Sequence, residues 1–422
     1  MGVARQHPAG ISLGSITRYF PIELVETILE DTGRQSVRRR KLPAPEMMYY
    51  VIALGLYFSD GCREVLRRVI RRVRPTWPEE YDQDVSSESA ISQARTRLGS
   101  KPVERLYHAV ARPIATRSTG GAWYRRWRLV TIDGTLLDVA DTPKNARAFH
   151  RPGVSFGSAA YPQLRVVSLL ENGTHVLFGA ALGGYQTGEM TLAKKVVQRL
   201  SSDALCLADR GLFGFPLWCA ARQTGAELLW RVSSNLVLPR LRELTDRSYL
   251  TKIYPSPNHR RDDRDGVWVR VISFEAGPAA KREPYRLLCS ILDPRKAPAI
   301  QLANLYAKRW TVETTFAELK TRLRGTAVVL RSQTPEHVRQ DVYGMLLAHF
   351  GVRALMHEAA LAQRTEPGAL SFLGALRIIH RHLPQFVSFP PSVRLTGPSS
   401  DPSPDRPLQD PLPPSPSLAS CC

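Results

Sequence analysis

Apolar residues recur at helical spacing through residues 1–125. The segments Ser15–Leu29 and Ala44–Val73 carry them every three or four positions, which predicts a helix in each. The segment Glu88–Leu98 is shorter, polar and basic, and its few apolar positions also fit one helical face. We therefore predict a mainly helical N-terminal domain.

After residue 126 the pattern changes to short apolar and β-branched runs, which predict strands. The expected strands are Arg128–Ile132, Leu164–Leu170, His175–Leu182, Ala204–Ala208 and Glu227–Val232, and the expected helices are Thr191–Leu200 and Phe215–Gln223. The pair Asn172-Gly173 predicts a hairpin turn between the second and third strands. Three strands followed by helix, strand, helix and strand is the order of an RNase H-like α/β core, which we place at residues 126–232.

The rest of the chain divides into four parts. Residues 233–292 contain strand-like runs around the charged loop HRRDDRDG and predict a β-rich insertion. Helical periodicity returns in residues 293–328, which would complete the core, and continues in a helical C-terminal region, 329–389. Residues 390–422 are rich in Pro and Ser and nearly free of large apolar side chains, so we expect this tail to be disordered.

Charge narrows the choice of partners. The chain has 58 basic and 38 acidic side chains, a net charge of +20, which favours a polyanion because neutralised phosphates release counterions. An anionic membrane is the alternative, but the longest apolar run, Met47–Phe58, is shorter than the ~20 residues of a spanning helix. The pattern therefore predicts a nucleic-acid partner and no membrane.

Cysteine usage points to the cytoplasm. The six cysteines form no Cys-x2-Cys pair and have no zinc-like spacing to histidine. A chain of this length with so few cysteines does not need a disulfide framework. We expect reduced thiols in a cytoplasmic, nucleoid-associated protein.

Two aspartates follow predicted strands in matching contexts. Asp133 stands in TIDGT after the first strand, and Asp209 stands in CLADRG after the fourth. In an RNase H-like sheet these strands are neighbours, so both carboxylates would lie at one edge. An aspartate before a glycine is also a common turn former, and each one alone would favour that interpretation. Two in matching contexts shift the balance toward a site.

A third acidic residue lies in the segment YAKRWTVETTFAELKTRL. Tyr306, Arg309, Glu313 and Lys320 would fall within a stripe of roughly 60° on one helix face, at ~100° per residue. The alternative is a solvated amphipathic helix with an ordinary ion pair between Arg309 and Glu313. The spacing alone leaves both interpretations open.

The pattern Tyr-x2-Arg-x3-Glu-x6-Lys resembles the signature of insertion-sequence transposases of the IS-four family, and all four positions match. The segments DGTLLDVADTPKN and LADRGLFG are similar to that family's two aspartate regions. The resemblance implies an RNase H-like fold with Asp133, Asp209 and Glu313 as a metal-binding catalytic triad. Two Mg²⁺ ions, or Mn²⁺ in their place, prefer such carboxylate oxygens and suit phosphoryl transfer.

The same resemblance implies a DNA transposase. It would bind double-stranded terminal inverted repeats, nick them, and transfer the 3′-hydroxyl ends to target DNA as a homodimer in a synaptic complex. Arg309 and Lys320 would hold phosphates near the cleaved end, and Tyr306 would position the DNA backbone. Two alternatives stay open: a catalytically silent DNA-binding protein derived from a transposase, and a stand-alone RNase H-like nuclease.

Three further side chains, Arg95, Arg97 and Trp268, are candidates for contact with DNA. Arg95 and Arg97 in Glu88–Leu98 would suit a recognition helix that reaches base edges, although an ordinary surface helix has the same pattern. Trp268 in the insertion could stack on a flipped base, and a tryptophan of the core is the alternative. We expect Asp138 and Asp141 to lie beyond the strand end, in a surface or loop role.

Overall fold

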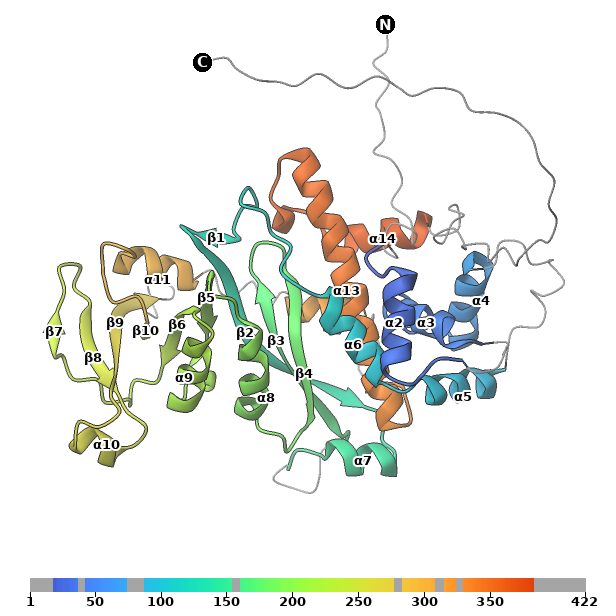
Figure 1. The fold of residues 1–422 in the computed structure, drawn as a ribbon, viewed down its shortest axis with the longest axis horizontal. Helices are drawn as coiled ribbons and strands as arrows, with labels where there is room; N and C mark the ends of the chain where they lie inside the picture. The colour runs from blue at the N-terminus through green and yellow to red at the C-terminus, as the bar shows by residue number, and fades with distance from the viewer. Residues whose placement is uncertain are drawn as a thin grey trace, which may run out of the picture. The chain divides into compact units, whose positions relative to one another are not determined.

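A mixed β-sheet organises the computed structural model (Figure 1). The structure describes residues 18–36, 42–73, 87–153, 160–276, 283–307, 315–323 and 329–382. Within these residues the sheet has 11 strands, in the order β4-β3-β2-β5-β6-β10-β9-β8-β7, and β1 (Trp123–Tyr124) and β11 (Val329–Leu330) both pair with β2.

The first five long strands form the predicted core. They are β2 (Trp127–Val139), β3 (Gln163–Glu171), β4 (Val176–Gly184), β5 (Ala204–Ala208) and β6 (Glu227–Val232). β2, β3 and β4 form an antiparallel meander, whereas β5 and β6 run parallel to β2. This order and direction confirm the RNase H-like prediction. The predicted hairpin turn is residues 172–175, where His175 has a φ of 61°.

Side-chain alternation along β2 separates two layers. Val130 and Ile132 belong to one apolar cluster with α8 (Glu189–Val196) and α9 (Phe215–Gln223). Leu129 belongs to a second cluster on the other face, together with α11 (Ala299–Ala307). All five residues of β5 are buried, as expected for a parallel strand covered on both faces. Short 3₁₀ turns follow α8 and β5, at Val197–Arg199 and Arg210–Leu212.

The insertion extends the same sheet. Its elements are β7 (Arg242–Glu243), β8 (Tyr249–Ile253), α10 (Pro257–Arg261), β9 (Val267–Ala276) and β10 (Glu283–Cys289). β10 pairs antiparallel with β6, with Leu288 opposite Trp230, and the outer strands follow in turn. The predicted β-rich segment is therefore continuous with the core through backbone hydrogen bonds.

The N-terminal region is helical, with boundaries that differ from the prediction. Its helices are α2 (Ile22–Asp31), α3 (Ala44–Leu56), α4 (Cys62–Val73), α5 (Glu88–Leu98) and α6 (Lys101–Val110). The expected helix over Ala44–Val73 was wrong as one element, because the turn formers Ser59, Asp60 and Gly61 separate α3 from α4. The first helix begins only after Pro21, and residues 15–17 lie outside the described residues.

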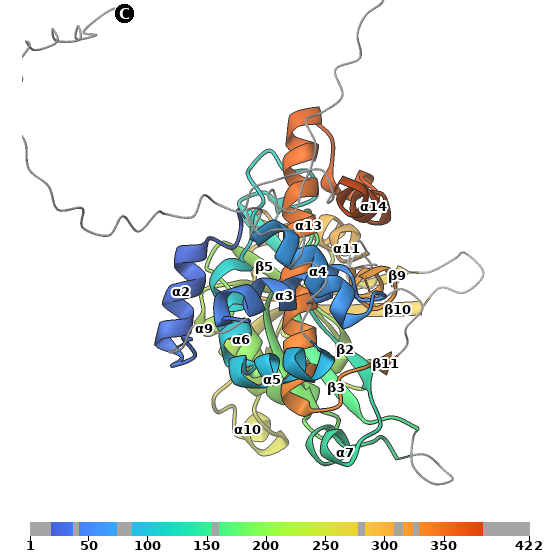
Figure 2. The same cartoon turned by 90° about the vertical axis from the view of Figure 1, so that its right-hand side faces the viewer.

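The long helix α13 (Pro335–Gln363) joins the N-terminal helices to the core (Figure 2). It crosses α3 where two glycines meet. A Cβ on Gly55 would lie 2.5 Å from the carbonyl oxygen of Gly344, so only glycine allows this approach. Four shorter elements complete the described part of the fold: α7 (Pro143–Phe149), a π-helical segment (Glu318–Leu323), a 3₁₀ turn (Pro367–Ala369) and α14 (Phe372–His382).

The described residues belong to one compact unit, Met1–Pro390. The predicted disordered tail, 390–422, lies outside the described residues. In the described part of the chain, each helix is too short or too polar to cross a bilayer.

Candidate active site

The two aspartates lie side by side where β5 stops pairing with β2. Ile132 and Ala208 are the last partners of the two parallel strands, and Asp133 and Asp209 are the next residue on each. Adjacent strands are ~4.8 Å apart, so the carboxylates start from neighbouring positions. The sequence interpretation was wrong in one respect, because β2 does not end at Asp133. It continues to Val139 against β3, and only its pairing with β5 ends.

Both aspartates face the layer that contains α11. Successive side chains of a strand alternate between the faces, so Asp209 lies on the face of Leu205 and Leu207. Both leucines belong to the α11 cluster, as does Leu129, which shares a face with Asp133. Each aspartate is half-buried. The site is therefore a carboxylate pair at the end of the β2–β5 pairing, on the sheet face that α11 covers.

Tyr306 connects α11 to this site. Its side chain is buried, and its hydroxyl lies 3.2 Å from the carbonyl oxygen of Ala208 and 3.3 Å from Oδ1 of Asp209. The hydroxyl donates to one of these acceptors or is shared between them. The structure thus brings together Tyr306 and Asp209, which are 97 positions apart in the sequence.

Arg231 is a site residue that the sequence interpretation missed. Its guanidinium nitrogen is 3.7 Å from Oδ1 of Asp209, and its Cζ lies 3.8 Å above the ring of Tyr285 on β10. The β5–β6 register explains the contact, since Ala208 pairs with Trp230 and the next residues face each other. The strand order with its register would have revealed Arg231, whereas no local motif marks it.

The remaining members of the expected tetrad are only partly described. Arg309 and Glu313 lie in residues 308–314, outside the described residues. Lys320 is half-buried and belongs to a π-helical segment, Glu318–Leu323. A π-helix has more residues per turn than an α-helix, so the spacing of ~100° per residue does not fix where Lys320 points.

The donor set fits a hard divalent cation. Asp133 and Asp209 present carboxylate oxygens on one face, which Mg²⁺ prefers over nitrogen or sulfur. Among the described residues, no group of three or more His, Cys, Asp or Glu side chains is placed to hold a metal ion. The two aspartates therefore need a further ligand, and Glu313 is the sequence candidate.

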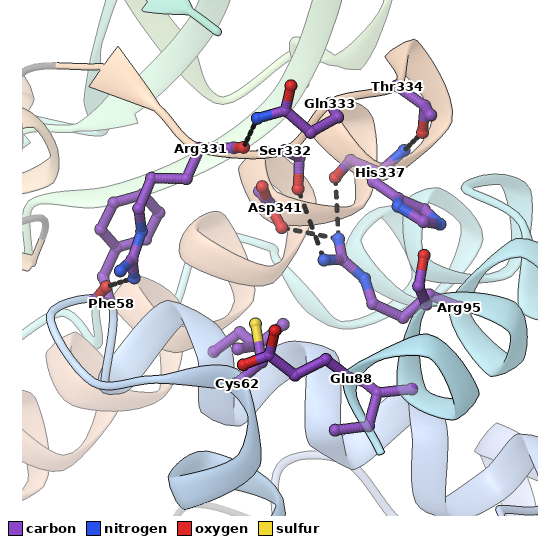
Figure 3. A pocket seen from close by; sticks show the side chains of 13 residues that line it. Phe58, Cys62, Glu88, Arg95, Arg331, Ser332, Gln333, Thr334, His337 and Asp341 are labelled. Carbon is purple, nitrogen blue, oxygen red and sulfur yellow. Dashed lines mark hydrogen bonds and ion pairs between the residues drawn. The ribbon is translucent and has the colours of Figure 1, made fainter.

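The two arginines of α5 differ in their surroundings. Arg95 is buried and pairs with Asp341 at 2.7 Å, and it also donates to the His337 carbonyl (Figure 3). Its Nε atom donates to the Gln340 side chain. These contacts occupy its guanidinium and fit a role in docking α5 on α13. Arg97 is exposed and remains available to a ligand.

Trp268 is 45% exposed, so the interpretation of a core tryptophan was wrong. It lies on β9 with the Lys252 ammonium 5.3 Å from its ring centroid. The expectation for Asp138 also needs correction: it lies within β2 and accepts a hydrogen bond from Gln163 at 2.8 Å. Asp141 follows the strand and pairs with Arg151.

Two family models match the chain. Residues 10–108 match the insertion element 4 transposase N-terminal model, and residues 127–350, more than half of the chain, match the transposase DDE domain. The chain belongs to the insertion element 4 family of DDE transposases. It is therefore a DNA transposase, an enzyme that cleaves and transfers DNA, and the DDE domain implies use of a divalent metal.

Two known proteins show the extent of the similarity. The transposase is 28% identical over 374 residues to transposase InsG for insertion sequence element IS4 of Escherichia coli, which covers 88% of this chain and 83% of that protein. The cryo-EM structure of the piggyBac transposase synaptic complex with hairpin DNA has a TM-score of 0.45 and 15% identity. That match covers 88% of this chain and 79% of the other.

Proposed function

We propose that Asp133, Asp209 and Glu313 are the catalytic triad of this transposase and hold two Mg²⁺ ions, which Mn²⁺ can replace. The observation that carries the proposal is the in-register placement of Asp133 and Asp209 at the end of the β2–β5 pairing. When bound, the ions would supply an activated hydroxyl and neutralise charge on the leaving oxygen.

The neighbouring side chains would bind and orient the DNA. Tyr306 holds Asp209 from one side, and Arg231 faces the same carboxylate from β6. We propose that Arg309 and Lys320 bind phosphates beside the cleaved end, since guanidinium and ammonium groups are common phosphate contacts. Tyr306 would position the DNA backbone as well as the carboxylate.

Two outlying residues would contact DNA away from the reacting phosphate. Arg97 is exposed on α5, where it can reach a phosphate or a base edge. Trp268 is exposed on β9 and offers a flat surface on which an unstacked base can lie. Arg95 is left out of this surface because its donors are taken by α13.

In this proposal the enzyme nicks the terminal inverted repeats and transfers the 3′-hydroxyl ends to target DNA. Two protomers bring the two ends together in a synaptic homodimer. One alternative is a catalytically silent DNA-binding protein derived from a transposase, and the carboxylate pair argues against it. The other is a stand-alone nuclease, which would cleave DNA but would not join it.

The test uses the purified full chain, linear DNA with candidate terminal repeats, and Mg²⁺ or Mn²⁺. We expect cleavage at the repeat boundary and joined products, both absent with EDTA and in Glu313→Gln. Binding without cleavage in either metal would support the silent protein instead. Cleavage without joined products would support the nuclease, and equal activity of the variant would remove Glu313 from the triad.

A further inference from the structure

A basic surface surrounds the turn between β1 and β2. Exposed cationic side chains from three segments meet there, and we call them together the hairpin surface. They are Arg117 from the loop after α6, Arg125 and Arg126 from the β1–β2 turn, and Arg295 and Lys296 from the turn before α11. Asp293 pairs with Arg295 at 3.2 Å, and the other four cations leave these side chains with a net positive charge.

Hydrogen bonds to the backbone hold the three segments together. Nη1 of Arg125 donates to the carbonyl oxygens of Arg295 at 3.1 Å and Lys296 at 2.6 Å. Nη1 of Arg117 donates to the carbonyl oxygen of Arg126 at 3.2 Å. Because these acceptors are carbonyls and not carboxylates, the bonds fix the segments without neutralising their charge. Arg125 also has a φ of 55°, so the turn keeps a guanidinium where the backbone favours glycine.

The next arginine along β2 shows a different environment. Arg128 is largely buried and pairs with the buried carboxylate of Glu171, so its charge is matched within the fold. Arg126 and Lys296 are exposed to solvent. Exposed guanidinium and ammonium groups are the usual contacts of DNA phosphates. The hairpin surface therefore suits a polyanion, and DNA is the polyanion on which a transposase acts.

Helix α11 connects the hairpin surface to the aspartate pair. The start of β2 and α11 lie next to each other (Figure 1), and the Tyr124 hydroxyl donates to Oε1 of Gln301 on α11 at 2.8 Å. Near the other end of the helix, Tyr306 lies within hydrogen-bond distance of Asp209. One helix thus contacts the hairpin at one end and the catalytic aspartates at the other.

We propose that the hairpin surface binds the phosphate backbone of duplex DNA about six base pairs from the cleaved phosphate. Trp127, beside the turn, and Asp133 are ~20 Å apart along β2, at ~3.3 Å per residue. Duplex DNA rises about 3.4 Å per base pair, which gives the spacing. The inference rests on the proposed function, in which Asp133 and Asp209 mark the point of cleavage. The duplex lies either inside the transposon end or outside it, and both present the same phosphates.

The test compares Arg126→Ala/Lys296→Ala with a matched control, Lys194→Ala/Lys195→Ala. The control removes two exposed cations from α8, which packs on the opposite face of the sheet. A second control, Arg126→Lys/Lys296→Arg, keeps both charges. Affinity for duplex DNA with a candidate terminal repeat is measured in EDTA at 50 to 200 mM salt, so that cleavage does not intervene. Urea midpoints establish that each variant is folded.

For Arg126→Ala/Lys296→Ala we expect the slope of log affinity against log salt to fall by about 1.8, since each phosphate contact contributes about 0.9. Both controls should keep the wild-type slope. The measurement is repeated on duplexes cut to about four base pairs inside or outside the cleavage point. One of the two should remove the difference between the wild type and the alanine variant, which identifies the side that the hairpin surface holds.

A wild-type slope in Arg126→Ala/Lys296→Ala would overturn the inference, and so would an equal fall in either control. A difference that persists on both shortened duplexes would also overturn it, because the contact would then lie closer to the cleaved phosphate than about six base pairs. Failure of the proposed function gives a different result, in which Glu313→Gln cleaves as well as the wild type while the salt slopes stay as expected.

Discussion

Asp133 and Asp209 occupy matching positions, one residue past the last paired residues of β2 and β5. The two carboxylates share the face covered by α11, whose Tyr306 lies within hydrogen-bond distance of Asp209. β2 continues beyond this point while β5 turns into a 3₁₀ segment at Arg210. Because β5 ends where β2 continues, the two aspartates occupy neighbouring positions on the same face of the sheet.

Asparagine at either position should abolish cleavage and leave DNA binding intact. The amide keeps the shape of the carboxylate but removes the charge that a divalent cation needs. Because losing a group behind a metal ligand costs about 10–100-fold, losing the ligand itself should cost more than about 100-fold in cleavage rate. Single-turnover cleavage assays and DNA titrations of Asp133→Asn and Asp209→Asn measure both quantities.

Asp138→Asn is the matched control on the same strand. Asp138 is half-buried like Asp133, but its partner is the Gln163 amide and it lies at the far end of β2. The Asp138→Asn variant should cleave DNA at a rate within about twofold of the wild-type rate, as expected for a substitution away from the site. A loss of cleavage rate comparable to that of Asp133→Asn would show that cleavage depends on an intact strand β2 and not on the aspartate pair in particular.

Local pattern was enough to predict the elements that bring the aspartates together. The run Ala204–Ala208 is apolar throughout and bounded by polar residues, so β5 was predicted with its observed ends, and so was β6. Once the strand order was inferred, the adjacency of Asp133 and Asp209 followed from it. The two motifs, together with the strand order, therefore suffice to predict that Asp133 and Asp209 lie side by side.

Distant partners were not predictable in the same way. Arg95 has the pattern of an exposed helix residue, but it meets Asp341, 246 positions later in the chain. Arg231 reaches Asp209 through the β5–β6 register, and the π-turn at Glu318 departs from the α-helical periodicity that the sequence pattern predicts. Each depends on tertiary packing, which can override local preference.

Substitutions of Arg95 and Arg97 should have different effects, one on the stability of the fold and the other on DNA binding. Arg97→Ala removes an exposed cation, so the unfolding free energy should change by less than about 0.5 kcal/mol. If Arg97 contacts a phosphate, the slope of log affinity against log salt should fall by about 0.9. Arg95→Ala leaves Asp341 buried without its partner and should destabilise the fold by about 3–5 kcal/mol.

Urea unfolding and binding titrations at several salt concentrations measure these two effects. The Arg95→Ala variant should keep the wild-type salt slope at a temperature where it is folded. A reduced slope for Arg95→Ala, with Arg97→Ala unchanged, would reverse the assignment of the two side chains.

Trp268 should matter for cleavage more than for binding. Stacking of a base on an aromatic ring is worth about 1–3 kcal/mol, so Trp268→Ala should lower the cleavage rate by roughly 5–150-fold if a base is unstacked there. Trp268→Phe retains a ring and should recover part of the rate. Fluorescence of a base analogue beside the cleavage site reports unstacking directly. Wild-type cleavage by Trp268→Ala would exclude this role.

Two buried histidines should make the fold sensitive to mild acid. Burial, reinforced by the neighbouring Arg353, lowers the pKa of His175 to about 4, and burial with the nearby Arg95 lowers the pKa of His337 to about 4. Their ordinary pKa is 6.5, so the unfolded chain binds protons between pH 6.5 and 4 that the folded chain excludes. Stability is therefore complete above pH 6.5 and falls as the pH is lowered toward 4.

Each histidine should contribute a slope of up to about 1.4 kcal/mol per pH unit to the unfolding free energy in that range. Urea unfolding between pH 4.5 and 7.5 measures the slope while the carboxylates with lowered pKa, such as Glu318, stay ionised. His175→Asn is the variant of choice, because asparagine tolerates the positive φ of this position better than most residues. Its unfolding free energy should vary less steeply with pH than that of the wild type. An unchanged slope would mean that His175 does not take up the proton, because the rest of the chain is the same in both proteins.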